Sequence, residues 1–108
     1  MKVVKLSHPN YEYDVHSLVK AFYAEDQVTV ITPETKPEKL AELEPQVSLE
    51  IELAETGAKI RVGEEDFLWD AEMETIADGY KNGLKRFLYR TLSKVTGQKL
   101  PCLLYTSP

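Results

Sequence analysis

Hydrophobic and polar residues alternate in the middle of the chain, and this alternation predicts a β-hairpin. Apolar side chains occupy every second position of residues 47–54, as in a strand that buries one face. A glycine-containing turn at residues 55–57 follows, and the alternation returns over residues 58–62. Lys59 and Arg61 then face the acidic residues of the first strand, and such cross-strand pairs contribute about 0.2–1 kcal/mol each. We expect a solvated charged face here, with a binding surface as the alternative.

Two stretches have the periodicity of amphipathic helices. The first follows Asp14, a candidate N-cap, and is short enough to need packing on a sheet for its stability. The second lies between Asp70, another candidate N-cap, and Gly97, a residue type that commonly ends helices. The apolar positions of the two series are Val15, Leu18, Val19 and Phe22, and then Met73, Ile76, Ala77, Tyr80, Leu84, Phe87, Leu88, Thr91, Leu92 and Val95.

Short apolar runs predict the remaining strands. Residues 3–6 precede a turn at residues 8–10, and residues 28–32 are β-branched throughout. Residues 33–45 are rich in proline, glutamate and lysine, which indicates a solvated connection with one helical turn around residues 38–43. The predicted order is β-α-β-β-β-α. This is an α+β domain with a small mixed, mostly antiparallel sheet and two helices packed on one face.

Size and charge limit the classes of function. The 108 residues fit one domain, and 13 basic against 18 acidic residues give a net charge of −5. That field repels polyanions, so we expect no nucleic-acid partner. No apolar run is long enough to span a membrane, and residues 1–8 lack the apolar core of a signal peptide, so we expect a cytoplasmic protein with no membrane partner. The single cysteine, Cys102, excludes an internal disulfide and a multi-cysteine metal site within this chain.

Few residues point to catalytic chemistry. His8 and His16 are the only histidines, and neither lies in a pattern with a cysteine or another nucleophile. His16 falls off the apolar stripe of the first helix, so we expect it to face solvent. The acidic run at residues 64–66 lacks the spacing of a calcium loop, and we interpret it as a solvated turn before the last helix. We therefore assign no catalytic, cofactor-binding or metal-ligating residue.

Two further features allow binding roles. A partly exposed Trp69 would anchor a protein partner, although core positions suit most of the aromatic residues. The basic residues of the last helix would contact phosphates, but a solvated face explains them better because the aromatic residues lie on the buried stripe. These basic residues are Lys81, Lys85, Arg86, Arg90 and Lys94.

Residues 84–101 read Leu-Lys-Arg-Phe-Leu-Tyr-Arg-Thr-Leu-Ser-Lys-Val-Thr-Gly-Gln-Lys-Leu-Pro. This stretch resembles the end of the N-terminal domain in oxygen-independent coproporphyrinogen III dehydrogenases (oxidases) of the HemZ type. The resemblance implies a long helix that ends at a Thr-Gly turn, and the upstream order of elements is similar. It also implies that residues 1–101 are an accessory α+β domain in heme and porphyrin biosynthesis, whose partner is a radical S-adenosylmethionine barrel of the same chain.

In that family the barrel holds a 4Fe-4S cluster through a Cys-x-x-x-Cys-x-x-Cys motif, uses S-adenosylmethionine and oxidatively decarboxylates porphyrinogen propionates. None of its motifs occurs here, so no cofactor ligand or catalytic residue is carried over. The chain departs from the family after Pro101, where Trp-Gly is expected. Residues 102–108, Cys-Leu-Leu-Tyr-Thr-Ser-Pro, resemble the translation of a transposase-type sequencing adapter. We therefore expect a truncated fragment that is inactive by itself, with residues 102–108 as a non-native tail.

The alternative function is a free-standing α+β protein-interaction module that binds its partner through an edge strand or Trp69. A third hypothesis is a nucleic-acid module that uses the basic face of the last helix. The family resemblance predicts an uncovered apolar patch where the barrel would dock, and an evenly polar surface would count against it.

Overall fold

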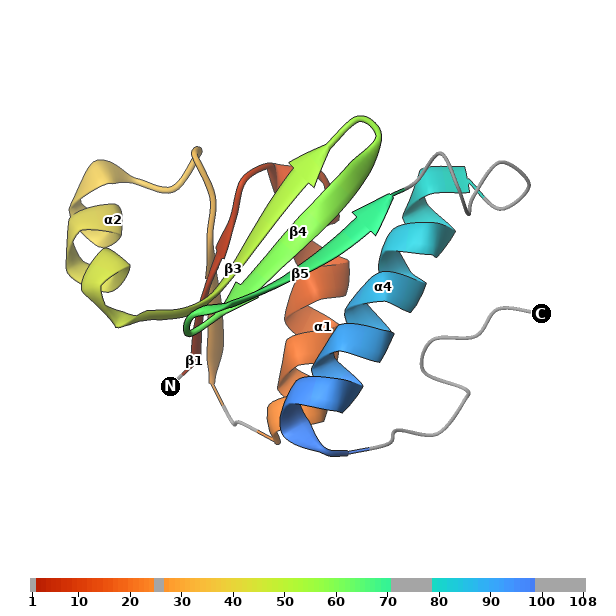
Figure 1. The fold of residues 1–108 in the computed structure, drawn as a ribbon. Helices are drawn as coiled ribbons and strands as arrows, with labels where there is room; N and C mark the ends of the chain where they lie inside the picture. The colour runs from red at the N-terminus through yellow and green to blue at the C-terminus, as the bar shows by residue number, and fades with distance from the viewer. Residues whose placement is uncertain (1, 25–26, 71–78, 99–108) are drawn as a thin grey trace.

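A computed structural model describes residues 2–24, 27–70 and 79–98. These residues form a five-stranded mixed sheet with the order β2-β1-β3-β4-β5, and helices pack on it (Figure 1). The predicted α+β class is confirmed. Two of the four strand pairings are parallel, so the antiparallel share of the sheet is smaller than predicted.

The strands divide the sheet into a parallel half and an antiparallel half. β1 (Lys2–Leu6) lies between β2 (Val28–Ile31) and β3 (Val47–Ala54) and runs parallel to both. β4 (Gly57–Val62) and β5 (Glu65–Asp70) continue the sheet as antiparallel strands. The hairpin predicted for residues 47–62 is therefore confirmed as β3 and β4.

Helices lie on both faces of the sheet. α1 (Glu12–Tyr23) and α4 (Gly79–Thr96) pack on one face, and α2 (Pro37–Leu43) lies over β1 and β2 on the other face. Two short 3-10 turns, η1 (Pro9–Tyr11) and η2 (Glu44–Gln46), connect these elements. The single helical turn expected around residues 38–43 is confirmed as α2.

The main core fills the space between the sheet, α1 and α4. All four apolar positions predicted for α1 are buried, and four of those predicted for α4 join them. Each large apolar side chain that is fully buried contributes roughly 1.5–3 kcal/mol. A smaller cluster of Val3, Ile31 and Leu43 lies beneath α2. The α4 members of the main core are Leu84, Phe87, Leu88 and Leu92.

Several local predictions are wrong. Asp14 lies in the first turn of α1, which begins at Glu12, so it is not the N-cap. Asp70 is the last residue of β5, and the segment that it was predicted to cap lies outside the described residues. The acidic run at residues 64–66 was interpreted as a solvated turn, but two of its three residues lie in β5, an additional strand that begins at Glu65. Residues 71–78 of the predicted last helix and the expected tail at residues 102–108 lie outside the described residues. The predicted end of the last helix is confirmed, because α4 stops at Thr96.

Candidate functional site

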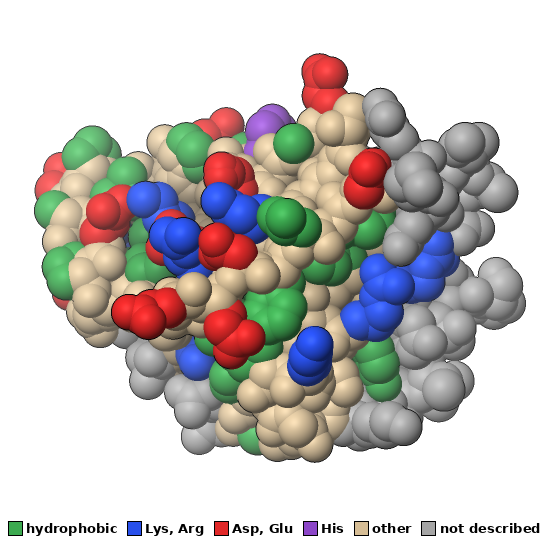
Figure 2. Space-filling view, viewed as in Figure 1, with side chains coloured by type: hydrophobic (Ala, Val, Ile, Leu, Met, Phe, Trp, Pro, Cys, Tyr) green, Lys and Arg blue, Asp and Glu red, His purple; other side chains and the backbone are tan. Residues whose placement is uncertain are grey.

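Within the described residues, no helix lies over β3, β4 and β5 on the side of the sheet away from α1 and α4. We call this surface the open face. Side chains of a strand alternate between the two faces, so the buried Leu49 and Ile51 place Glu50 and Glu52 on the open face. Figure 2 shows acidic and basic side chains interleaved across this surface. Its residues are Lys5, Ser7, Glu50, Glu52, Lys59, Arg61, Asp66 and Leu68.

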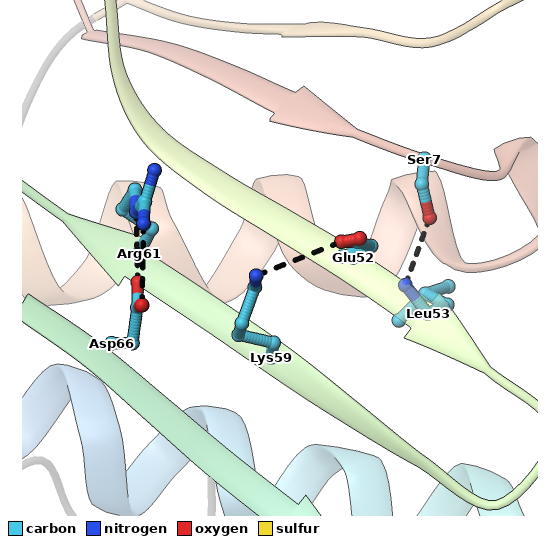
Figure 3. A network of polar contacts seen from close by, with 6 residues as sticks. All are labelled: Ser7, Glu52, Leu53, Lys59, Arg61 and Asp66. Carbon is cyan, nitrogen blue, oxygen red and sulfur yellow. Dashed lines mark hydrogen bonds and ion pairs between the residues drawn. The ribbon is translucent and has the colours of Figure 1, made fainter.

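A row of alternating charge crosses the open face from β1 to β5. The register pairs Lys5 with Glu50, Glu50 with Arg61, and Arg61 with Asp66. Arg61 donates two hydrogen bonds to Asp66, from Nε to Oδ1 at 2.8 Å and from Nη2 to Oδ2 at 3.3 Å (Figure 3). This hydrogen bonding lowers the pKa of the Asp66 carboxyl and raises the pKa of Arg61. The bidentate geometry orders both side chains on the surface.

Two further ion pairs flank that row. Lys59 Nζ lies 3.9 Å from Glu52 Oε2 on the neighbouring strand, which is one of the predicted hairpin pairs. Lys5 Nζ lies 3.0 Å from Glu44 Oε1 in the turn after α2, and this contact raises the pKa of Lys5. Each cation of the open face is therefore paired with a carboxylate.

Glu50 is the central carboxylate of the open face. It lies between Lys5 and Arg61 in the register, and its negative charge adds to the raised pKa of each. Those two cations form their closest ion pairs with other residues, and Glu50 has no ion pair among the described residues. The row thus leaves one carboxylate available to a cation from outside.

The open face is hollowed in two adjoining places. A groove of about 370 Å³ runs beside Lys5, Glu50 and Arg61. A more open hollow of about 560 Å³ adjoins it at Glu52 and Lys59 and is lined by Gly57 and Leu68. Their mixed polar and apolar linings can take a partner's side chains.

The two histidines lie apart from the open-face ion pairs. His8 is exposed, and its Nδ1 accepts a hydrogen bond from the backbone N–H of Asn10 at 3.3 Å. His16 was expected to face solvent, but it is partly buried and its Nε2 lies 2.9 Å from the carbonyl oxygen of Val28. The carbonyl can only accept, so Nε2 carries the proton. Both histidines thus contact backbone groups, His8 within its own turn and His16 across from α1 to β2.

Trp69 is a core residue, as expected for most of the aromatic residues, and the alternative of a partly exposed anchor is wrong. Its side chain is 5% exposed and packs in the main core. Its neighbour Leu68 is 77% exposed on the open face. The exposure of Leu68 was not predicted, because Phe67, Leu68 and Trp69 are three successive apolar residues and show no alternation that would assign one of them to the exposed face.

The basic face of α4 makes contacts within the protein. Lys85 Nζ lies 3.5 Å from Asp14 Oδ1, and Lys94 Nζ lies 6.0 Å from the ring centre of Phe67. Arg86 and Arg90 also have interaction partners. The side chain of Lys81 lies outside the described residues. These contacts favour a structural role for the basic residues over phosphate binding.

The described surface has two exposed large hydrophobic side chains, Tyr13 on α1 and Leu68 on β5. They lie on different layers of the molecule, so the broad apolar patch expected for barrel docking is not found in residues 2–24, 27–70 and 79–98, and this result counts against that expectation. In the same residues no group of three or more His, Cys, Asp or Glu could hold a metal ion. None of the helices described is both long and apolar enough to cross a membrane.

Comparisons with known proteins found no matching family model, no matching curated protein and no matching solved structure.

Proposed function

We propose that this chain is the accessory N-terminal domain of a cytoplasmic radical S-adenosylmethionine coproporphyrinogen III dehydrogenase of heme biosynthesis. The support is the sequence of residues 84–98 together with the structure that they adopt. The resemblance implies a long helix that ends at a Thr-Gly turn. α4 ends at Thr96, and Gly97 has a φ of +73°, the left-handed conformation in which glycine commonly ends helices.

In this proposal the open face of the sheet docks on the catalytic barrel. The single observation that carries the docking role is the combination of ordered charges and Leu68 on a face that no described helix covers. Exposed ion pairs contribute only about 0–1 kcal/mol each to stability, so their order serves recognition better than folding. Complementary charges at an interface fix its register and exclude wrong partners. Glu50 offers a carboxylate to a basic side chain, and Leu68 offers an apolar contact beside it.

In the proposed parent protein, the barrel and this N-terminal domain have different roles. The oxidation, with its 4Fe-4S cluster and S-adenosylmethionine, belongs to the barrel. The described residues supply a binding surface, and none of them is proposed as a cluster ligand or a catalytic group.

Thiol labelling tests this docking. Leu68→Cys and Tyr13→Cys are made separately, in this chain with Cys102→Ser and in the full-length parent protein. Both positions are exposed here, at 77% and 83%. We expect the thiol at position 68 to react about tenfold more slowly in the parent, as in a covered interface, and the thiol at position 13 to react equally in both. Equal rates for position 68 would contradict docking through the open face.

The alternative function, a free-standing protein-interaction module, is favoured by one observation. Leu68 is exposed on β5, and an exposed large apolar side chain can be the anchor of a protein–protein contact. The module would use Leu68 in place of the buried Trp69. A gene that ends near residue 101 would favour this alternative.

A further inference from the structure

The two edges of the described sheet differ in charge. β5 carries Glu65, Asp66 and Asp70, and charged residues of this kind discourage another strand from pairing with an edge. β2 is the opposite edge, and its sequence Val-Thr-Val-Ile has no charge. An uncharged, β-branched edge is a template for strand addition. β2 therefore needs a different form of protection.

The hydrogen bonds of β2 show which of its backbone groups point outward. Lys2 N donates to Gln27 O at 3.0 Å, so the Gln27 carbonyl points toward β1. In a parallel pair, alternate residues of a strand bond to the same neighbour. Thr29 therefore points toward β1, and the N–H and C=O groups of Val28, Val30 and Thr32 point away from the sheet.

Groups from outside the sheet bond to outward backbone groups at both ends of β2. The Val28 carbonyl accepts a hydrogen bond from His16 of α1 at 2.9 Å. At the other end, Thr32 N donates to Thr35 Oγ1 at 2.9 Å, and Thr32 O accepts from Thr35 N at 3.0 Å. Among the described residues, only Val30 keeps both outward backbone groups without a partner.

We propose that His16 and Thr35 cap the outer edge of β2 and keep a second copy of this chain from adding a strand there. An incoming strand runs about 4.8 Å from its neighbour, where the bonded side chains of His16 and Thr35 stand. Between the two caps only the outward N–H and C=O groups of Val30 remain available. One residue is too short a stretch for stable strand pairing. A second copy is the natural competitor, because two β2 strands can pair antiparallel about Val30 with identical, uncharged sequences. This role does not depend on the proposed function.

Hydrogen exchange of the wild-type chain tests the geometry. We expect the amide of Val30 to exchange about tenfold faster than those of Thr29 and Thr32, which are bonded to β1 and to Thr35. Equal protection at the three positions would overturn the proposal, because it would show that the outward N–H of Val30 already has a hydrogen-bond partner.

Sedimentation of variants tests the consequence. We expect H16A/T35A to self-associate with rising concentration and the wild type to remain monomeric. The control H8A/T56A removes the same residue types from exposed positions elsewhere and should stay monomeric. Adding Val30→Pro to H16A/T35A should restore the monomer, because proline removes the outward N–H and is tolerated on a free edge. A folded H16A/T35A that stays monomeric, or association that survives Val30→Pro, would overturn the proposal. If H16A/T35A does not fold, the exchange measurement decides.

Discussion

The ring of Trp69 stacks on the ring of Phe87, with centroids 6.0 Å apart and planes inclined by 22°. This contact joins β5 to α4 and places Trp69 in the main core. Leu68, the preceding residue, points to the opposite face and is exposed. Two successive residues of one strand therefore have opposite roles, one in stability and one at the candidate docking surface.

Truncating these two neighbours should separate the roles. We expect Trp69→Ala to lower the free energy of unfolding by about 3–5 kcal/mol, because it leaves a cavity beside Phe87. Leu68→Ala should change the free energy by less than about 0.5 kcal/mol, because the side chain makes little buried contact. Urea unfolding measures both. Similar losses at the two positions would show that β5 does not have this orientation.

Gly57, the first residue of β4, and Gly63, the residue after its end, should tolerate substitution by alanine very differently. A Cβ at Gly57 would overlap the backbone oxygen of Trp69, so we expect Gly57→Ala to cost about 3 kcal/mol of stability through overpacking. Gly63 has open space around it and a φ of +62°, so Gly63→Ala should cost only about 1 kcal/mol of backbone strain. Thermal unfolding measures the order, and a larger loss at Gly63 would contradict it.

Removing the hydroxyl of Tyr23 should stabilise the protein. Within the described residues this hydroxyl is buried without a hydrogen-bond partner, and a buried unsatisfied polar group costs free energy. We expect Tyr23→Phe to raise the free energy of unfolding by about 1 kcal/mol and to keep the contact of Lys2 Nζ, 3.7 Å from the ring centre. Tyr13→Phe, at an exposed position, is the control and should have no effect. A loss of stability in Tyr23→Phe would reveal a partner for the hydroxyl.

The same residue should make the wild type sensitive to alkali. Burial raises the pKa of Tyr23 above its ordinary value of 10.0. When the pKa of a group is higher in the folded state than in the unfolded state, its protonation favours the folded state. This stabilisation is fully present below the ordinary pKa and is lost as the pH rises through the raised pKa. The stability difference between wild type and Tyr23→Phe should therefore grow above about pH 10. A constant difference would show that Tyr23 titrates as in the unfolded chain.

Asp66 should contribute to stability at neutral pH and not in acid. Hydrogen bonds from Arg61 lower its pKa below the ordinary value of 3.8, so its contribution is present above that value and is lost as the pH falls through the lowered pKa. Asp66→Asn should be less stable than wild type at about pH 7, and the two should converge in acid. Glu64→Gln, an exposed neighbour outside the pair, should follow the wild type throughout. Failure of Asp66→Asn to converge would contradict the ion pair.

The sequence predicted the elements whose hydrophobic residues repeat at a regular spacing. The α1 stripe and the β3–β4 hairpin follow directly from spacings of 3.6 and 2 residues. β5 was missed because its six residues include three acidic ones, and because Asp70 also suited a helix cap. The observed ion-pair partners of Arg61 and Lys5 were not predicted either, since Arg61 was expected to pair with the first hairpin strand and pairs with Asp66 of β5. The carboxylate of Asp66 reaches Arg61 only because residues 65–70 form the strand that was missed. The carboxylate of Glu44 reaches Lys5 because α2 positions the turn that follows it.

The claim that this domain precedes a radical S-adenosylmethionine barrel is tested most directly by sequencing the source gene beyond the codon for Pro101. We expect the reading frame to continue into Trp-Gly and then to a Cys-x-x-x-Cys-x-x-Cys motif. A stop codon near position 101, or a continuation without that motif, would contradict the claim and leave the interaction module as the function to pursue.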